Sequence, residues 1–277
     1  MAPKLGEQDQ DKCLVQSHNT VVMAQLNVQM EEMSWPSIRK AIDSGFRTVL
    51  IPVGSIEQHG PHLPIFTDAL LAYDLCERVA NMLGRTLVAP VIRPGCSEHH
   101  LSFPGTISIS PRLLRQMVEA YVRSLISSGF ENFVIIPTHG GNFEPLKRGF
   151  SAIRRKYRKA NIYGYFDLQH FVQAMNDVAA QFGVSSEAAG AHSGFSETSC
   201  VLAVRKDLVD ISSATPGYVG PFDEKVSKQI IKRGMAAFTK NGVLGDPSRS
   251  SIEAGQKIIQ NLVDHIVAAL TEMKLRT

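Results

Sequence analysis

The hydrophobic positions of this chain alternate between short apolar runs and longer amphipathic stretches. Residues 48–53 (TVLIPV) form a β-branched run typical of a strand buried on both faces, and residues 67–83 place their leucines on one helical stripe. Further strands are predicted over residues 86–92, 133–136 and 162–166, and further helices over residues 111–126, 142–157 and 168–182. This alternation predicts an α/β fold in which helices flank a mostly parallel sheet on both faces.

Helices are also predicted at both ends of this pattern. Ser34 is suited to cap a first helix with Pro36 in its first turn, and Gly45 is suited to end it. Residues 251–273 repeat apolar side chains at helical spacing and predict a long last helix. On that helix His265 is expected to be an ordinary helix residue and not a ligand.

Composition and charge narrow the class of protein. The 277 residues are 44% hydrophobic, enough for one large domain, and no repeat or linker divides them. We therefore expect residues 21–277 to form one domain behind a flexible N-terminal arm of residues 1–20. The formal charge of +3 is spread along the chain, which argues against a nucleic-acid partner. Without a recognisable leader peptide or a membrane-length apolar run, we expect a cytoplasmic protein with no membrane contact.

Two polar clusters directly follow predicted strands. Residues 54–64 (GSIEQHGPHLP) come after the first strand and residues 138–142 (THGGN) after the third, and the carboxyl ends of parallel strands meet where ligands bind. Glu57 and His59 stand two positions apart, so in extended backbone they point the same way and could grip one ion or two adjacent ions. Asp68 falls in the first turn of the next helix, where an ordinary capping acid is the alternative interpretation.

A third polar cluster, residues 190–199 (GAHSGFSETS), is a small-residue loop that runs into an apolar segment. Taken alone, Glu197 could belong to a helix cap and His192 could satisfy buried backbone groups. Together the three clusters supply histidines and three carboxylates but no thiolate, a ligand set for two divalent ions of Zn, Mn or Fe(II). Two such ions leave about one positive charge, which acidifies bridging water and polarises a carbonyl, so hydrolysis is the expected chemistry.

Five separated motifs of this chain resemble, in their order, those of the creatininase (creatinine amidohydrolase) family. They are VGSIEQHGPHLPIFTD, SEHHLSFPGTIS, HGGN, AHSGFSETS and GVLGDPS, and the likeness runs from about Trp35 to the C-terminus. The family also includes formamide-cleaving deformylases of flavin and deazaflavin biosynthesis and a mycofactocin-maturing peptidase. The resemblance implies a single-domain three-layer α/β sandwich, assembly into a homohexamer or another homo-oligomer, and a two-metal site that hydrolyses non-peptide C–N bonds.

The resemblance also implies which residues bind the metals. Glu57 and His59 match ligands of opposite ions, Asp68 matches a bridging aspartate, and His139 matches the histidine of the HGGN segment. The implied fifth ligand is Glu197 of the ETS motif.

One ligand position departs from the family pattern. In creatininase proper a glutamate stands two residues after the HGGN histidine, whereas this chain has Gly141 there, so Glu197 is the carboxylate left to complete the site. His192 matches the family's catalytic histidine, which implies that it carries a proton to the leaving nitrogen.

The substrate pocket departs from creatininase proper as well. Ser97, His99 and His100 lie in the loop after the second predicted strand and are expected at the pocket rim as substrate-binding residues, although a plain loop role is an alternative. Creatininase proper relies on pocket tryptophans, but the one tryptophan here, Trp35, is far in sequence from the metal motifs, so creatinine is not the expected substrate. Residues 210–222 are expected either to cover the pocket or to contact a neighbouring subunit.

Three functions follow from these residues. The preferred one is metal-dependent hydrolysis of a small cyclic amide or formamide, in which a bridging hydroxide attacks the carbonyl and His192 protonates the departing nitrogen. The alternatives are a peptidase that acts on a modified peptide and a non-catalytic binding or oligomerisation scaffold of the same fold. The intact acidic and histidine positions favour an enzyme, because a scaffold has no need of so unfavourable a buried polar cluster.

Overall fold

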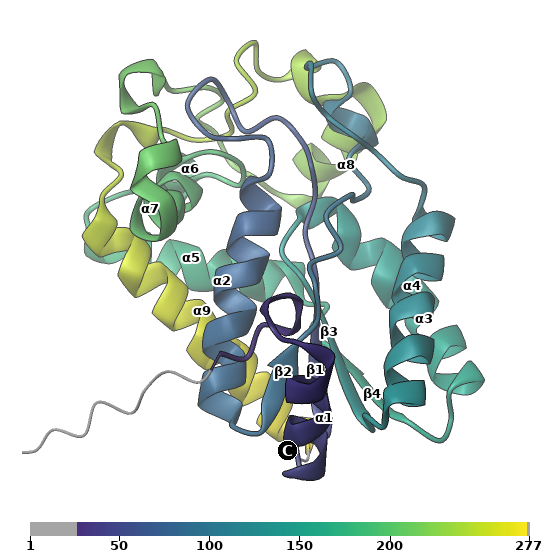
Figure 1. Ribbon diagram of the computed structural model, residues 1–277. Coiled ribbons are helices and arrows are strands. Elements are labelled where there is room, and N and C mark those ends of the chain that lie inside the picture. Colours follow the sequence, from purple (N-terminus) through teal and green to yellow (C-terminus); the bar gives the residue numbers. More distant parts are fainter. Residues whose placement is uncertain (1–26, 276–277) are drawn as a thin grey trace, which may run out of the picture.

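The computed structural model describes residues 27–275 and has a parallel sheet between two layers of helices (Figure 1). Among these residues the four strands of the sheet run in the order β2-β1-β3-β4, and each neighbouring pair is parallel. They are β1 (Thr48–Val53), β2 (Thr86–Val88), β3 (Asn132–Pro137) and β4 (Asn161–Gly164). The predicted α/β sandwich is confirmed, while the arm predicted over residues 1–20 lies outside the described residues.

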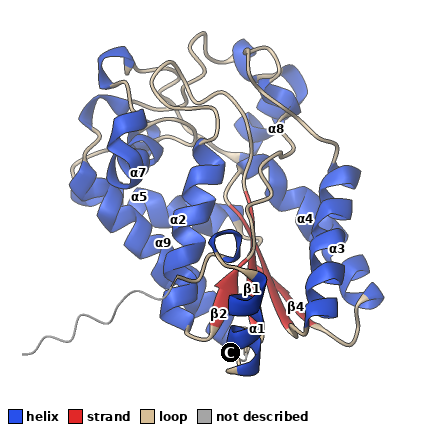
Figure 2. Cartoon of the chain, in the orientation of Figure 1, coloured by secondary structure: helices blue, strands red, loops and turns tan. Residues whose placement is uncertain are grey.

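Helices cover both faces of the sheet, as the secondary-structure colours of Figure 2 show. One layer contains α2 (Thr67–Leu83), α5 (Leu168–Gln181), α7 (Phe195–Arg205) and α9 (Ile252–Glu272), and the other contains α3 (Pro111–Ser128) and α4 (Gly140–Lys156). The remaining helices are α1 (Trp35–Asp43), α6 (Ser186–Ala189) and α8 (Glu224–Arg233). Single 3-10 turns occupy Met30–Glu32, Glu98–His100, Lys206–Leu208, Ile211–Ser213, Met235–Ala237 and Pro247–Arg249.

Helix ends follow the local signals in the sequence. The side chains of Ser34, Ser110 and Ser251 each accept a hydrogen bond from a backbone N–H of the first turn of α1, α3 and α9, and so satisfy a donor that has no partner inside the helix. Gly129 ends α3 in the left-handed region, with φ of 107°. The predicted starts of the first and last helices are therefore confirmed.

The second strand is shorter than its apolar run predicts. A strand was expected over residues 86–92, but β2 ends at Val88 because Pro90 has no N–H to donate to a ladder. The segment nevertheless stays beside β1, since the amides of Ala89 and Ile92 donate to β1 carbonyls at 2.9 and 3.0 Å. The prediction was wrong in length and right in place.

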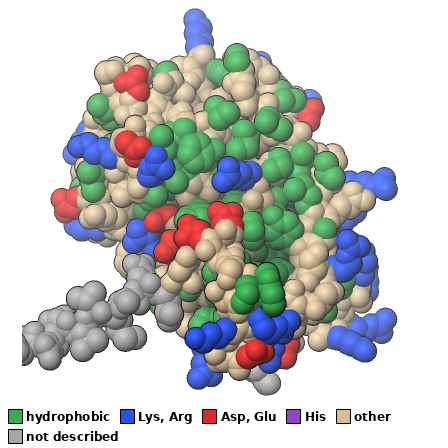
Figure 3. All heavy atoms as spheres, viewed as in Figure 1, with side chains coloured by type: hydrophobic (Ala, Val, Ile, Leu, Met, Phe, Trp, Pro, Cys, Tyr) green, Lys and Arg blue, Asp and Glu red, His purple; other side chains and the backbone are tan. Residues whose placement is uncertain are grey.

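The core lies between the sheet and its two helical layers. Every residue of β1 and β3 is buried, as expected of strands covered on both faces. On the surface, the face shown in Figure 3 has Lys and Arg side chains dispersed among Asp and Glu. Within residues 27–275, no helix combines the length and the apolarity needed to span a bilayer.

Candidate metal centre

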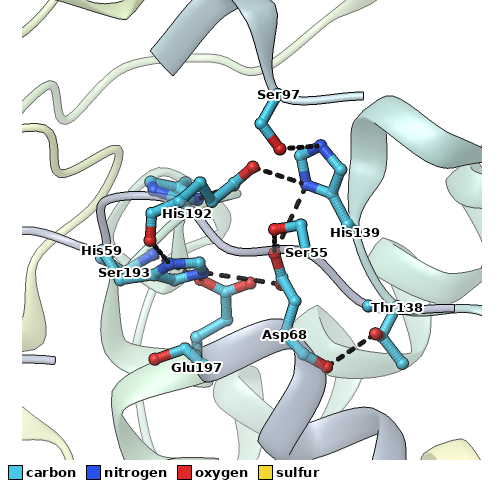
Figure 4. Close-up of polar contacts among 12 residues, drawn as sticks. Ser55, His59, Asp68, Ser97, Thr138, His139, His192, Ser193 and Glu197 are labelled. Atoms are coloured by element: carbon cyan, nitrogen blue, oxygen red, sulfur yellow. Dashed lines mark hydrogen bonds and ion pairs between the residues drawn. The ribbon is translucent and has the colours of Figure 1, made fainter. Parts of the chain in front are cut away.

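Five acidic and histidine side chains meet beyond the carboxyl ends of β1 and β3. The loop after β1 carries two of them, the first turn of α2 one, the residue before α4 one, and the first turn of α7 one. They are Glu57, His59, Asp68, His139 and Glu197, and Figure 4 shows four of these side chains directed toward one another. Four of the five are buried and Glu197 is half-buried. The structure thus brings together all five predicted metal ligands.

Asp68 lies at the middle of this cluster. One carboxylate oxygen, Oδ1, is 3.5 Å from His59 Nε2, and the other, Oδ2, is 3.4 Å from His139 Nδ1. Ser55 Oγ donates a hydrogen bond to Oδ2 at 2.6 Å, which holds the carboxylate in place. The side chain does not cap α2, whose N-terminus has no side-chain cap. Because its two oxygens face different histidines, Asp68 has the arrangement of a bridging ligand.

Two groups of three potential ligands share this aspartate. Asp68 joins Glu57 and His139 in one group and His59 and Glu197 in the other, and within each group the ligand atoms lie within 4.8 Å of one another. Each group offers nitrogen and oxygen donors to one divalent ion. A third group joins Glu57 and His59 with His192, so the ligand atoms of these two residues also lie close to each other.

Backbone carbonyls set which nitrogen of each histidine faces the carboxylates. His59 Nδ1 lies 3.1 Å from Glu57 O, and His139 Nε2 lies 3.2 Å from Cys96 O. A carbonyl can only accept, so each of these nitrogens carries a proton and donates it. In the neutral rings the opposite nitrogens, His59 Nε2 and His139 Nδ1, then present lone pairs to the carboxylates, as metal-binding histidines do.

Several polar atoms of the cluster have no hydrogen-bond partner. Within residues 27–275, this holds for both carboxylate oxygens of Glu57 and for His59 Nε2, although all three atoms are buried. Burial of such atoms is costly unless something replaces their lost hydration. A cation between the carboxylates and the histidine nitrogens would do so, and the donor set therefore fits divalent metal ions.

The pKa shifts of the histidines in the metal-free cluster also indicate that this site favours positive charge. Burial works against a charge on His59, but the carboxylates of Asp68, Glu197 and Glu57 outweigh it and raise the pKa of His59 to about 9. Burial also opposes a charge on His139, and there Glu57 and Asp68 raise the pKa well above its usual value. Protons on these two rings thus offset the charge of the buried carboxylates.

Glu197 combines a structural and a candidate ligand role. Its Oε2 accepts a hydrogen bond from the amide of Ser193 at 2.5 Å and lies 3.9 Å from His59 Nε2. Ser193 has φ of 55°, a left-handed conformation that turns this amide toward the carboxylate. Burial, against the charge of His59, raises the pKa of Glu197 to about 7. Glu197 thus orders the loop before α7 but does not cap the helix, whose N-terminus has no side-chain cap, and this contact leaves it in the cluster.

Gly141 has no room for the glutamate that creatininase proper carries at this position. A Cβ atom there would lie 2.4 Å from both Cys96 O and His139 Nε2, so any side chain would displace the hydrogen bond that orients His139. Glu197 instead approaches the cluster from α7, where its Oε2 lies 3.9 Å from His59 Nε2.

His192 faces the same cluster from the loop before α7. Its Nε2 donates to Gln58 O at 2.8 Å, so its Nδ1 is the free nitrogen, 3.7 Å from Glu57 Oε1. Burial and the nearby His59 lower the pKa of His192 to about 3. The late GVLGDPS motif holds this loop, because Leu244 N donates to His192 O at 2.8 Å.

The three predicted rim residues occupy different positions. His99 is half-buried and lines the cavity over the cluster. His100 also lines it but is fully buried, with Nε2 3.3 Å from Glu57 Oε1. Ser97 is buried behind His139, with Oγ 3.4 Å from Nε2 of that ring. The rim position was therefore wrong for Ser97 and His100, because the 3-10 turn Glu98–His100 folds this loop inward.

Several supporting residues were missed by sequence reasoning. Asn142 connects two loops, accepting from Cys96 N at 2.9 Å through Oδ1 and donating to Gly54 O at 2.9 Å through Nδ2. Thr138 Oγ1 donates to the backbone carbonyl of Asp68 at 2.9 Å. Their signal was their place inside the polar segments that directly follow buried strands.

A cavity of about 90 Å³ opens onto the cluster. One wall consists of the acidic and histidine side chains, and the opposite wall is apolar. The apolar wall comprises Leu168, Phe222, Ile230, Ile231, Met235 and Leu244. Phe222 comes from the segment of residues 210–222 that is predicted to be either a cover or a subunit contact, so one end of that segment lines the cavity.

A parallel α/β sheet with buried carboxylates and histidines at its carboxyl edge defines the class of this protein, an α/β protein with a candidate centre for metal ions. The family model "Creatininase: Creatinine amidohydrolase" matches residues 31–270, and the chain belongs to this family of hydrolases. The comparison with known proteins thus agrees with the five motifs.

Individual relatives are similar over most of their length. A "Mycofactocin precursor peptide peptidase" of Mycobacterium ulcerans (strain Agy99) is 32% identical over 84% of this chain and 88% of its own. A "Creatinine amidohydrolase" of Pseudomonas putida is 27% identical over 89% of this chain and 97% of its own. A solved mutant creatininase of "Zn-Zn type" superposes with a TM-score of 0.72 at 26% identity, over 89% of this chain and 98% of that one.

Proposed function

We propose that this protein is an amidohydrolase that cleaves the C–N bond of a small cyclic amide or formamide with the help of two divalent ions, Zn, Mn or Fe(II). The observation that carries the proposal is Asp68, whose two oxygens face two separate groups of ligands. Family membership supports hydrolysis, and the "Zn-Zn type" description of a similar structure supports a metal pair.

The residues divide the work between metal binding and proton transfer. Glu57 and His139 would hold one ion and His59 and Glu197 the other, with Asp68 shared. Bound ions of this kind acidify water and polarise a carbonyl group.

His192 is placed to move the proton. Its Nδ1 is free because Nε2 donates to a backbone carbonyl, so Nδ1 can accept a proton released from the attacking water. The same atom then delivers that proton to the departing nitrogen. The low pKa of His192 keeps the ring neutral at neutral pH, so the lone pair of Nδ1 is available.

A peptidase acting on a modified peptide is the second candidate, and two observations favour it. One is the 32% identical relative that is named a peptidase. The other is the apolar wall, whose mouth exposes 64% of Ile231 and 39% of Phe222 to solvent. Exposed apolar side chains beside a pocket suit a substrate whose scissile bond is flanked by an apolar group.

A catalytically inactive scaffold is the third candidate, and the unpartnered oxygens of Glu57 argue against it. From the family resemblance we also propose a homo-oligomer, such as a homohexamer, to be measured by light scattering coupled to size-exclusion chromatography.

The test combines metal analysis with a substrate panel. We expect about two divalent ions per chain, and hydrolysis that a chelator abolishes and added Zn, Mn or Fe(II) restores. Turnover of lactams or formamides but not of peptides would support the small-amide proposal, and the reverse preference would support the peptidase. Substoichiometric metal, together with no turnover of small amides or of peptides, would overturn both the amidohydrolase and the peptidase proposals.

A further inference from the structure

We propose that Gln58, the middle residue of the EQH motif, is a positioning residue that fixes the proton of His100 on Nε2, so that His100 faces Glu57 with an N–H group and not with a lone pair. The claim about the proton stands on geometry alone. Its consequence for metal binding rests on the proposed function. Gln58 is 5% exposed and His100 is 1% exposed, so solvent has little access to either side chain.

Two backbone groups decide the orientation of the Gln58 amide. The N–H of Gly60 can only donate, and it lies 2.9 Å from Gln58 Oε1. The carbonyl of Gly242 can only accept, and it lies 3.1 Å from Gln58 Nε2. Oxygen and nitrogen of the amide are therefore assigned without reference to any histidine.

The amide nitrogen has a second hydrogen left to donate. It lies 2.9 Å from His100 Nδ1 and 3.1 Å from His192 Nε2. His192 Nε2 carries a hydrogen that it donates to Gln58 O, so it cannot also accept, and His100 Nδ1 is the acceptor. A neutral imidazole that accepts at Nδ1 carries its proton on Nε2, and in His100 this atom lies 3.3 Å from Glu57 Oε1. His100 consequently offers the cluster a proton and has no lone pair for a metal ion.

This orientation distinguishes His100 from the other histidines of the centre. In those rings the outer nitrogen donates to a backbone carbonyl, so in the neutral form the inner nitrogen has the lone pair. In His100 the outer nitrogen accepts from a side-chain amide, which reverses the roles. The proton on His100 Nε2 therefore lies next to Oε1 of Glu57. The other carboxylate oxygen, Oε2, faces His139 Nδ1 at 3.2 Å.

Gln58 can hold this orientation because the late loop packs directly against its amide. A Cβ atom added at Gly242 would lie 1.8 Å from Gln58 Oε1, so the backbone approaches as closely as a glycine permits. Gly242 also has φ of 82°, which glycine adopts without strain. The amide is thus held between its own loop at Gly60 and the GVLGDPS loop at Gly242.

The substitution Gln58→Glu should reverse the proton position. Its carboxylate can accept from Gly60 N–H but, when ionised, cannot donate to His100 Nδ1. The ring would then carry its proton on Nδ1 and turn a lone pair toward Glu57. The substitution Gln58→Met keeps a side chain of similar length but removes the amide, so nothing at this position favours a proton on either nitrogen of His100.

The direct test is long-range proton–nitrogen NMR of the imidazole rings in the full-length, metal-free protein labelled with ¹⁵N-histidine. The His100 signals are identified by their loss in His100→Asn. We expect a proton on Nε2 in the unsubstituted protein and a shift toward Nδ1 in Gln58→Glu. Gln29→Glu, which alters another buried glutamine distant from His100, is the matched control and should leave the signal unchanged. A proton on Nδ1 in the unsubstituted protein would overturn the proposal without any variant.

A second readout tests the consequence for the centre. We expect metal affinity, measured by competition with a chelator, to fall about 10- to 100-fold in Gln58→Glu and in Gln58→Met, because an oriented ligand loses its support. We also expect kcat to fall while KM stays nearly unchanged. Unaltered affinity and kcat in a folded Gln58→Met would contradict the positioning role. The NMR result does not depend on metal or turnover, so failure of the proposed function and failure of this inference are separately visible.

Discussion

Strands β1 and β3 and the ligand side chains directly beyond them are all buried, but for opposite reasons. Along β1 and β3 nearly every side chain is apolar, and burial itself stabilises the fold. Directly beyond these strands, Glu57, His59 and His139 are also buried, yet their burial is unfavourable unless each charge or lone pair finds a partner. The apolar burial of the strands thus offsets the unfavourable burial of the polar side chains at the centre.

The largest expected effect is on activity, from removal of the shared aspartate. Asp68→Asn removes a negative charge from both ligand groups, and we expect the metal pair to be lost and kcat/KM to fall by about a thousandfold or more. Thermal unfolding should show a folded protein. Asp74→Asn on the same helix breaks only the ion pair with Arg78 and should retain metal and activity. Full metal content in Asp68→Asn would refute the assignment.

The strand side of the comparison is tested by a core substitution. Ile135 of β3 is fully buried, so Ile135→Ala should lower the free energy of unfolding by about 2–5 kcal/mol, measured by denaturant titration. The metal bound per folded molecule should stay unchanged. If the metal bound per folded molecule fell together with the free energy of unfolding, the stability of the strands and the metal binding of the centre would not be separable.

The pH dependence of metal binding tests the protons on the centre. The pKa values of His59 and His139 lie above their unfolded values, so both rings are protonated at neutral pH and metal must displace these protons. Affinity should therefore rise with pH through the neutral range, about tenfold per pH unit for each proton that the metal displaces, and the contribution of His59 should level off as pH passes about 9. Calorimetry in buffers of different ionisation enthalpy would count the released protons.

The His59→Gln variant serves as the control for that measurement, because it should release one proton fewer. Metal binding that is independent of pH would show that the rings are neutral before metal enters.

The smallest expected effect is on metal affinity, from a substitution at Gly141. Gly141→Ala would push a Cβ against Cys96 O and His139 Nε2, and we expect metal affinity to fall about 10- to 100-fold as His139 loses its orientation. Gly140→Ala is the matched control, since its Cβ would meet only Leu168 at 4.0 Å. Equal metal affinity in the two variants, measured by chelator competition, would contradict the crowding argument.

Local sequence predicted most elements because each depends on nearby residues. The caps at Ser34 and Ser251 and the apolar run of β1 appear in the structure where the sequence places them. Two strands end earlier than predicted. β2 ends at Val88 because the effect of Pro90 on the ladder outweighs the apolar pattern, and β4 ends at Gly164, two residues before the predicted end.

For the centre, the sequence supplied the ligand types but not their contacts. Resemblance and position at strand ends identified all five side chains that meet there. The inward position of Ser97 and His100 was not predicted, because it depends on how the 3-10 turn packs against residues distant in sequence.

By itself, the sequence determined the alternation of strands and helices, the buried strand interiors and the chemistry available at the strand ends, because periodicity and side-chain type are local properties. Only the tertiary structure decided the strand order β2-β1-β3-β4, the crowding at Gly141 and the nitrogen that each histidine turns toward the carboxylates. The physical reason is that a hydrogen bond has a direction set by both partners, and for His100, His139 and His192 the second partner lies tens of residues or more away in the chain.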